Sequence, residues 1–271
     1  MYLMICQKPH FITIKKKKNI QNMMQLTVLP LFADRMEEKF NVFEILLKTL
    51  EKNNTELEEG DVLVISTKYI SNSQGRIVNL ENIRTSEEGM NISKKFQLKP
   101  EIAEIIIRES DKIFGGIGGF VITSSDNIMA PNAGIDKSNI KKGKAILYPT
   151  NPYLTAEQIR RKIFLELFIH VGIILVDSRL MTARIGTSGV AISCAGIEPV
   201  LDMRSKEDLD GNSLKVTFQA VVDNIATIAN YKMGEGAELK PFAIVEIQMQ
   251  NSQIEKLVQQ RWQYPLINVF T

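Results

Sequence analysis

Hydrophobic and polar positions follow two periods along the chain, and each period predicts a different kind of element. Apolar residues at three- and four-residue spacing are typical of amphipathic helices. Helices are predicted over residues 41–53, 100–110, 156–168 and 216–233. Short unbroken apolar runs are typical of buried strands, and alternating runs of half-buried ones. Strands are predicted at residues 25–30, 62–65, 120–123, 128–130, 172–176 and 241–247. Because strands and helices mix without strict βαβ alternation, the pattern favours an α+β fold with mixed sheets and packed helices. One continuous domain and two interleaved lobes are both open at this point.

The two ends of the chain differ from its middle. Residues 1–24 hold the lysine run 15–18 after a short apolar stretch, which is the reverse of a signal peptide, and they are predicted to be a leader that is disordered or not native. Residues 25–247 are predicted to form the functional domain, and residues 248–271 a helical tail.

Composition narrows the classes of function. The chain has 271 residues, of which 44% are hydrophobic and 24% charged, so it is expected to be globular. Its formal charge of +2 gives no reason to expect a nucleic-acid partner, and no apolar run is long enough to span a membrane. Cys6 and Cys194 sit in no metal-binding pattern and are expected to be reduced thiols of a cytoplasmic protein.

Three acidic residues are candidate metal ligands. Asp177 comes directly after the apolar run 172–176, Asp136 lies in the turn-rich segment 132–139, and Glu235 stands between two glycines after a predicted helix. A carboxylate at the end of an element is firmly placed yet open to solvent, which suits a hard divalent cation. For each acid taken alone, the commoner explanation is structural: a turn cap, a turn, or a helix C-cap with a solvated acid.

Other kinds of site are not supported by the sequence. It has no Walker A motif, so a nucleotide site would have to be of another type. Gly234 and Gly236 permit a backbone to approach a phosphate closely. His10 and His170 lack partners for a catalytic triad or a zinc site, and Cys194 is expected to be a buried small residue.

Taken in order, these segments resemble the coenzyme F420-0:γ-glutamyl ligase family, over residues 29–245. The resemblance rests on the order and spacing of several motifs. They are Gly-Asp-Val-Leu-Val-Ile-Ser-Thr-Lys at 60–68 with Gly75 and Arg76, Asn-Ala-Gly-Ile-Asp-Lys-Ser-Asn at 132–139, Asp177-Ser178, Gly186, Val-Ala-Ile at 190–192, residues 208–217, and Met233-Gly-Glu235.

The resemblance implies a role for each matching position. Asp136 and Asp177 match acidic ligands of one metal ion, while Ser178, where the family usually has Thr, and Glu235 match ligands of a second. The two acids Asp136 and Asp177 are therefore the expected catalytic residues. Contacts to the guanine nucleotide are implied for Asn139 and for Met233, Gly234, Glu235, Gly236, Ala237 and Glu238, and further for Leu29, Pro30, Leu31, Ser66 and Thr67.

The resemblance also implies a fold with two interleaved lobes, a reaction and its partners. Members look like α+β homodimers that use GTP and two Mg²⁺ or Mn²⁺ ions, with K⁺ as a further candidate ion, to join L-glutamate to coenzyme F420-0. A substrate carboxylate would attack the γ-phosphorus to give an acyl phosphate, and the amine of glutamate would then displace phosphate.

The chain departs from the family pattern beside the second acid. The family commonly continues its Asp-Thr pair with Phe-Gly-Arg-Pro-Trp-Arg-Asn-Gly-Gln-Thr-Asp, whereas residues 179–189 read Arg-Leu-Met-Thr-Ala-Arg-Ile-Gly-Thr-Ser-Gly. Asn72 and Gln74 likewise replace a Lys and a Glu. A related carboxylate acceptor is therefore an alternative to F420-0.

Three hypotheses follow. The first is a GTP- and metal-dependent glutamate ligase in F420 biosynthesis, the second is the same chemistry on another acceptor, and the third is a nucleotide-binding protein without catalysis. The first two require Asp136, Asp177 and Glu235 to converge within a few ångströms around shared cations.

Overall fold

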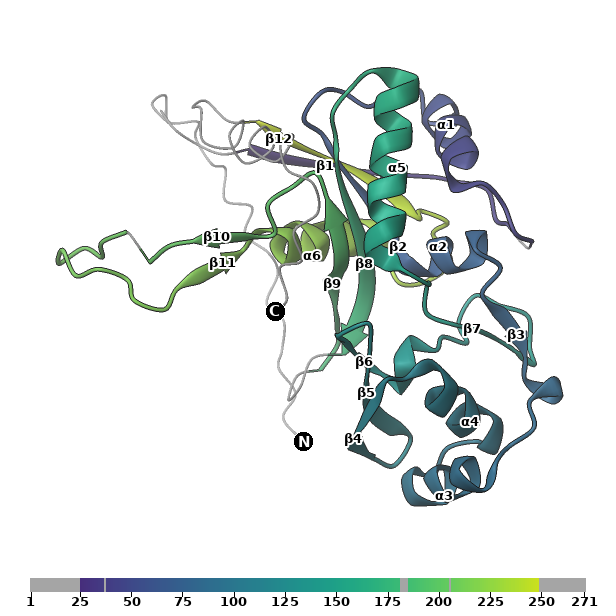
Figure 1. Ribbon diagram of the computed structural model, residues 1–271. Coiled ribbons are helices and arrows are strands. Elements are labelled where there is room, and N and C mark those ends of the chain that lie inside the picture. The colour runs from purple at the N-terminus through teal and green to yellow at the C-terminus, as the bar shows by residue number, and fades with distance from the viewer. Residues whose placement is uncertain (1–24, 37, 181–184, 205, 249–271) are drawn as a thin grey trace, which may run out of the picture.

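The centre of the molecule is a mixed five-stranded sheet whose strands come from both ends of the described chain (Figure 1). The computed structural model describes residues 25–36, 38–180, 185–204 and 206–248. The strands follow the order β1 (Gln25–Leu31), β12 (Phe242–Gln248), β2 (Val62–Ser66), β8 (Gly172–Leu180) and β9 (Thr187–Ala195). Only β2 and β8 pair in parallel, while the other neighbours are antiparallel.

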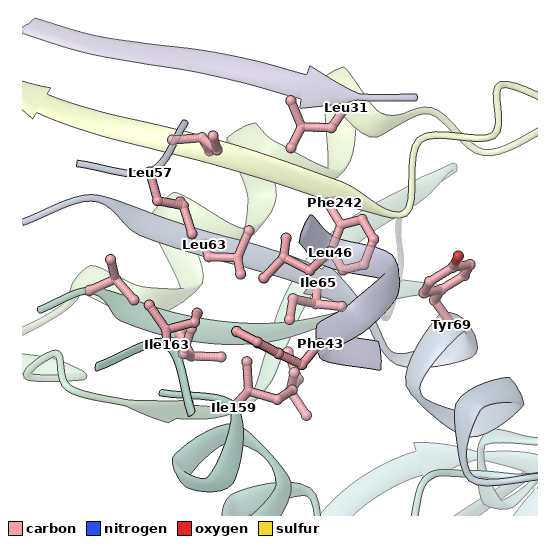
Figure 2. Packing of buried hydrophobic residues seen from close by; sticks show 14 of the residues in the cluster. Leu31, Phe43, Leu46, Leu57, Leu63, Ile65, Tyr69, Ile159, Ile163 and Phe242 are labelled. Atoms are coloured by element: carbon pink, nitrogen blue, oxygen red, sulfur yellow. The ribbon is translucent and has the colours of Figure 1, made fainter. Parts of the chain in front are cut away.

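Helices cover both faces of this sheet. Two of them, α1 (Val42–Lys52) and α5 (Pro152–Leu167), pack on one face, and α6 (Val221–Met233) packs on the other. Figure 2 shows the first interface, where Phe43, Leu46 and Ile163 meet the side chains of β2 and β12. Each buried aliphatic or aromatic side chain there contributes roughly 1.5–3 kcal/mol by leaving water. The sheet and its three helices thus form the main core.

The apolar runs of the two parallel strands are explained by burial on both faces. Along β2, Leu63 and Ile65 belong to the core under α1 and α5, whereas Val62 and Val64 belong to the core under α6. Successive side chains of a strand point to opposite faces, so a strand covered on both sides must be apolar at every position. The prediction of buried strands at 62–65 and 172–176 is confirmed.

A second lobe is inserted between β2 and β8. We call residues 77–148 the small lobe and the other described residues the sheet lobe. The small lobe contains β3 (Ile77–Asn79), η1 (Leu80–Asn82), α3 (Glu87–Phe96), α4 (Pro100–Glu109), β4 (Lys112–Ile117), β5 (Phe120–Ser125), β6 (Ile128–Pro131), η2 (Asn132–Gly134) and β7 (Lys144–Ile146). It lies below the sheet in Figure 1 and has its own core of Phe96, Ile102, Ile106, Val121 and Ala133. The α+β class with two interleaved lobes is therefore confirmed.

The remaining elements connect or extend these lobes. The short helix α2 (Thr67–Ser73) follows β2 directly. The ribbon of β10 (Val200–Asp202) and β11 (Phe218–Ala220) projects away from the body of the molecule in Figure 1. Among the helices that the structure describes, none has the length and apolar composition needed to cross a bilayer.

Two predicted boundaries were wrong for the same reason. The strand predicted to stop at Val176 continues to Leu180, because β9 pairs with β8 beyond its buried part, and Asp177 thus lies inside the strand. The helix predicted over 216–233 begins only at Val221, because Phe218–Ala220 pairs with β10. In both places a tertiary partner overrides the local pattern. The predicted leader 1–24 and most of the predicted tail 248–271 lie outside the described residues.

Candidate active site

A cavity of about 570 Å³ is lined by residues of both lobes. Its walls come from six segments of the chain. They are residues 33–36, residues 66–72 of β2 and α2, residues 131–139, residues 176–179 of β8, Thr187 of β9, and residues 230–241 with the end of α6. Asp136, Asp177, Ser178 and Glu235 all line this one cavity.

Asp177 is held by hydrogen bonds to both of its carboxylate oxygens. Thr67 donates its hydroxyl to Oδ1 at 3.1 Å, and Arg179 donates Nε to Oδ2 at 3.1 Å. Burial raises the pKa of Asp177; the nearby Arg179 guanidinium and the Thr67 hydroxyl offset part of this rise, and the negative charge of Asp136 adds to it. The charge of Asp136 thus acts on Asp177, and a cation bound near both carboxylates would offset it.

Asp136 faces the same cavity from the small lobe. Its Oδ2 lies 2.6 Å from Nζ of Lys68, and its Oδ1 accepts the backbone N–H of Ser138 at 2.6 Å. Burial raises the pKa of Asp136, but the hydrogen bond and charge of Lys68 and the bonds from Ser138 together outweigh it, so the pKa is lowered overall. Asp136 is therefore a carboxylate at neutral pH.

The loop that carries Asp136 needs glycine at one position. Gly134 has φ of +68°, and a Cβ there would lie 2.3 Å from Cδ2 of Tyr148. Glycine is the residue that accepts both this backbone angle and this close approach of the Tyr148 ring. The unusual angle predicted for Gly134 is confirmed.

Ser178, the residue after Asp177 in β8, forms a second polar pair with Glu235 in the loop after α6. Ser178 donates its hydroxyl to Oε1 of Glu235 at 2.7 Å, and Asn230 of α6 donates Nδ2 to the same oxygen at 2.8 Å. Gly234 separates Glu235 from the helix end with φ of +87°. The tight turn brings the carboxylate back toward β8.

The loop after α6 is joined to the small lobe. Asn139 donates Nδ2 to the carbonyl of Gly236 at 2.8 Å, and Glu238 accepts the backbone N–H of Gly236 at 2.7 Å. Met233, Gly234, Ala237 and Glu238 also line the cavity. The family-derived nucleotide contacts of this loop and of Asn139 are thus neighbours in space.

Not every predicted nucleotide contact lies in the cavity wall. Leu29, Pro30 and Leu31 belong to β1, and Leu31 is fully buried in the core, so the residues that face the cavity are the following ones, 33–36. Ser66 lines the cavity. Thr67 is buried and reaches the site through its bond to Asp177.

Sequence reasoning missed the basic residues and the amide that support the acids. Lys68, Arg179 and Asn230 hold Asp136, Asp177 and Glu235 respectively. Asp177 and Arg179 are two positions apart in one strand and so lie on one face of it, which the sequence would have indicated if the strand had been extended. Lys68 is paired with Asp136 by a tertiary contact alone, whereas Asn230 lies five residues before Glu235, near the end of α6.

The oxygen donors of the cavity suit a cation that is coordinated partly by the protein and partly by a bound polyanion. Among the described residues, no three His, Cys, Asp or Glu side chains lie close enough together to enclose a metal ion by themselves. Asp136, Asp177 and Glu235 do line one cavity, and their sharing of cations stays a prediction. Mg²⁺ is commonly held by one or two carboxylates, waters and substrate phosphates, and the paired oxygen donors here fit that arrangement.

Comparison with known proteins gives one consistent result. A family model described as F420-0:Gamma-glutamyl ligase matches residues 31–246. The Coenzyme F420:L-glutamate ligase of Archaeoglobus fulgidus is 33% identical over 199 residues, which are 73% of this chain and 80% of that protein. The protein of the same name from Methanocaldococcus jannaschii is 34% identical over 218 residues, which are 80% of this chain and 84% of that protein.

Proposed function

Because the chain belongs to the F420-0:Gamma-glutamyl ligase family, we propose that it forms a carbon–nitrogen bond between L-glutamate and coenzyme F420-0, using GTP and a divalent cation. The observation that supports this most directly is the shared cavity, which collects Asp136, Asp177, Ser178 and Glu235 from segments far apart in sequence. Its volume of about 570 Å³ is in the usual range for small-molecule and cofactor sites.

The proposed reaction has two steps. An oxygen of the acceptor carboxylate attacks the γ-phosphorus of GTP, the bond to the β-phosphate oxygen breaks, and GDP leaves. The amine of glutamate then attacks the acyl carbon of the acyl phosphate, the carbon–oxygen bond breaks, and phosphate and a proton are released. The difficulty in the first step is that two negatively charged groups must meet.

The residues of the cavity are suited to reduce this repulsion. A divalent cation bound by Asp136 and Asp177, or by Ser178 and Glu235, would supply positive charge at the triphosphate. Lys68 contributes a fixed ammonium at the Asp136 side of the cavity. Charges that are already oriented need no reorganisation during the reaction, which is why such groups stabilise a transition state efficiently.

The test is direct. Purified protein with GTP, Mn²⁺, L-glutamate and F420-0 is expected to release GDP and a product heavier by one glutamyl residue, measured by mass spectrometry. Asp177→Ala is expected to abolish both while leaving the circular dichroism spectrum unchanged. Equal product formation in excess EDTA would exclude the metal role, and GTP binding without any turnover would favour a non-catalytic nucleotide-binding protein.

A different carboxylate acceptor is the second candidate. It is favoured by Arg179, which stands beside Asp177 in the cavity wall where the family pattern has an aromatic residue. A screen of carboxylic acids with GTP and glutamate, read as GDP release, separates the two candidates. Turnover of another acid at a higher kcat/KM than F420-0 would favour the second.

A further inference from the structure

Arg179 makes more contacts than support of one carboxylate requires. It lies in β8, and its side chain is only 10% exposed. Its Nε donates to Oδ2 of Asp177 at 3.1 Å, its Nη2 donates to the Tyr148 hydroxyl at 2.9 Å, and its Nη1 donates to the carbonyl of Met129. All three nitrogens of the guanidinium are thus engaged.

These contacts connect the two lobes. Asp177 belongs to the central sheet, whereas Met129 is in β6 and Tyr148 follows β7, both in the small lobe. Tyr148 also packs against Gly134 in the loop that leads to Asp136. The planar guanidinium has a fixed fork of donors, so its orientation is set by all its partners together. A shift of the small lobe would therefore move the Arg179 guanidinium and, with it, the Asp177 carboxylate.

We propose that Arg179 is a positioning residue: it fixes the Asp177 carboxylate relative to the small lobe, so that the affinity of the site for a divalent cation depends on the Tyr148–Arg179–Asp177 chain of hydrogen bonds. The inference rests on the proposed metal role of Asp177. It assigns to Arg179 a role that acts on the metal ion through Asp177.

The competing explanation is that Arg179 neutralises Asp177 and excludes a cation. The geometry favours positioning, because each oxygen of Asp177 accepts one protein hydrogen bond and a carboxylate has about four acceptor sites in all. Lone pairs therefore remain for a cation on both oxygens. Replacing a residue that hydrogen-bonds to a metal ligand typically weakens metal affinity 10- to 100-fold.

The experiment titrates the full chain with Mn²⁺ in the absence of nucleotide and measures the concentration of free Mn²⁺ by electron paramagnetic resonance. Arg179→Met is expected to raise the Kd for Mn²⁺ about 10- to 100-fold. Arg179→Lys keeps the charge but lacks the fork, and is expected to bind as weakly as the Met variant. Tyr148→Phe leaves Asp177 and its charge partner in place and is expected to raise the Kd about fivefold, as for one lost hydrogen bond.

A matched control comes from the projecting ribbon. Arg204 pairs with Asp202 at the same two-residue spacing, with Nη2 2.6 Å from Oδ2, but it is exposed and distant in sequence from the site. Arg204→Met is expected to leave Mn²⁺ binding unchanged. A double variant, Tyr148→Phe with Arg179→Met, is expected to bind no more weakly than Arg179→Met alone, because both changes break one chain of contacts.

Each contrary outcome has a distinct meaning. Tighter Mn²⁺ binding by Arg179→Met would show that Arg179 excludes cations and would overturn the proposal. Wild-type affinity in Arg179→Lys would reduce its role to charge alone, and additive effects in the double variant would remove the link through Tyr148; either result overturns the proposal. If the Arg179→Met protein does not fold, the Mn²⁺ affinities of Tyr148→Phe and Arg179→Lys test the proposal in its place. If the wild type does not bind Mn²⁺ alone, all variants are titrated again with saturating GDP, whose phosphates supply further ligands. Failure of the wild type to bind Mn²⁺ with GDP present would instead contradict the proposed function.

Discussion

The two lobes present their acids to the shared cavity on different kinds of backbone. Asp177 lies in β8, directly after the last residue of that strand that pairs with β2, and its backbone stays paired with β9. Asp136 lies on a loop after η2, where its backbone makes one isolated bridge to Ile146 and its side chain is held by Lys68 and Ser138. Ligands on strands are held more closely than ligands on loops. The difference suggests one fixed and one adjustable side of the site.

The largest expected effect tests this difference at the two acids themselves. Asp177→Asn is expected to lower kcat/KM for glutamate ligation by about 10³-fold, or about 4 kcal/mol, because it removes the charge on the rigid side. Asp136→Asn is expected to cost about 10²-fold, since the loop can adjust. Steady-state kinetics at saturating Mn²⁺ measure both. Equal losses would show that the strand and the loop hold their acids equally well.

The second prediction compares the cores of the two lobes by replacing one isoleucine in each. Ile173 in β8 and Ile106 in α4 are both fully buried, but Ile106 belongs to a cluster of five buried residues whereas Ile173 belongs to the main core. Each change to alanine is expected to cost about 3 kcal/mol locally. Native-state hydrogen exchange is expected to show lost protection throughout the chain for Ile173→Ala, and in residues 77–148 alone for Ile106→Ala.

Loss of protection across both lobes in the Ile106→Ala protein would contradict this expectation. It would show that the two cores unfold as one cooperative unit, and the adjustable side of the site would then need another explanation than the smaller core.

The same contrast explains what the sequence could and could not predict. Buried strands such as β2 and β8, and the amphipathic helices α1, α4 and α5, were predicted because local patterns record burial. The helix α3 was missed, because most of its ten residues are polar and its start depends on Ser86 accepting the N–H of Gly89. Packing of few side chains leaves a weak pattern, and this is why the small lobe was predicted less completely.

The site shows the same limit. Single acids were ordinary turn residues until a family resemblance placed them in order, since no local pattern joins Asp136 to Asp177. The bonds of Arg179 to Met129 and Tyr148 reach 50 and 31 residues back along the chain. Contacts of that kind depend on the folded arrangement of the two lobes, and no spacing in the sequence indicates them.

The third prediction concerns the loop that carries Asp136. Gly134→Ala combines a strained φ of +68° with a Cβ that would meet the Tyr148 ring, whereas Gly143→Ala has a φ of +85° with nothing within 4 Å. The first change is expected to lower the free energy of unfolding by about 2 kcal/mol and the second by about 1 kcal/mol. Urea denaturation measures both, and Mn²⁺ affinity is expected to fall only for Gly134→Ala. Equal stability losses would mean that the Tyr148 ring moves away freely.

The smallest effect tests an acid that supports the small lobe without reaching the cavity. Glu104 is buried, and its Oε2 accepts the backbone N–H and the hydroxyl of Ser86 while its Oε1 accepts Nε of Arg108. The Ser86 bonds lower the pKa of Glu104, with a smaller part from Arg108.

A lowered pKa means that the carboxylate stabilises the fold at every pH above its pKa in the unfolded chain, about 4.3. This contribution disappears as the pH falls through the pKa of the folded protein. Glu104→Gln is therefore expected to lower the free energy of unfolding by about 1 kcal/mol at pH 7, and this difference from the wild type is expected to narrow only at acid pH. Urea denaturation at a series of pH values measures it. A difference that stays constant down to pH 3 would show that the shape of the Glu104 side chain, rather than its charge, stabilises the small lobe.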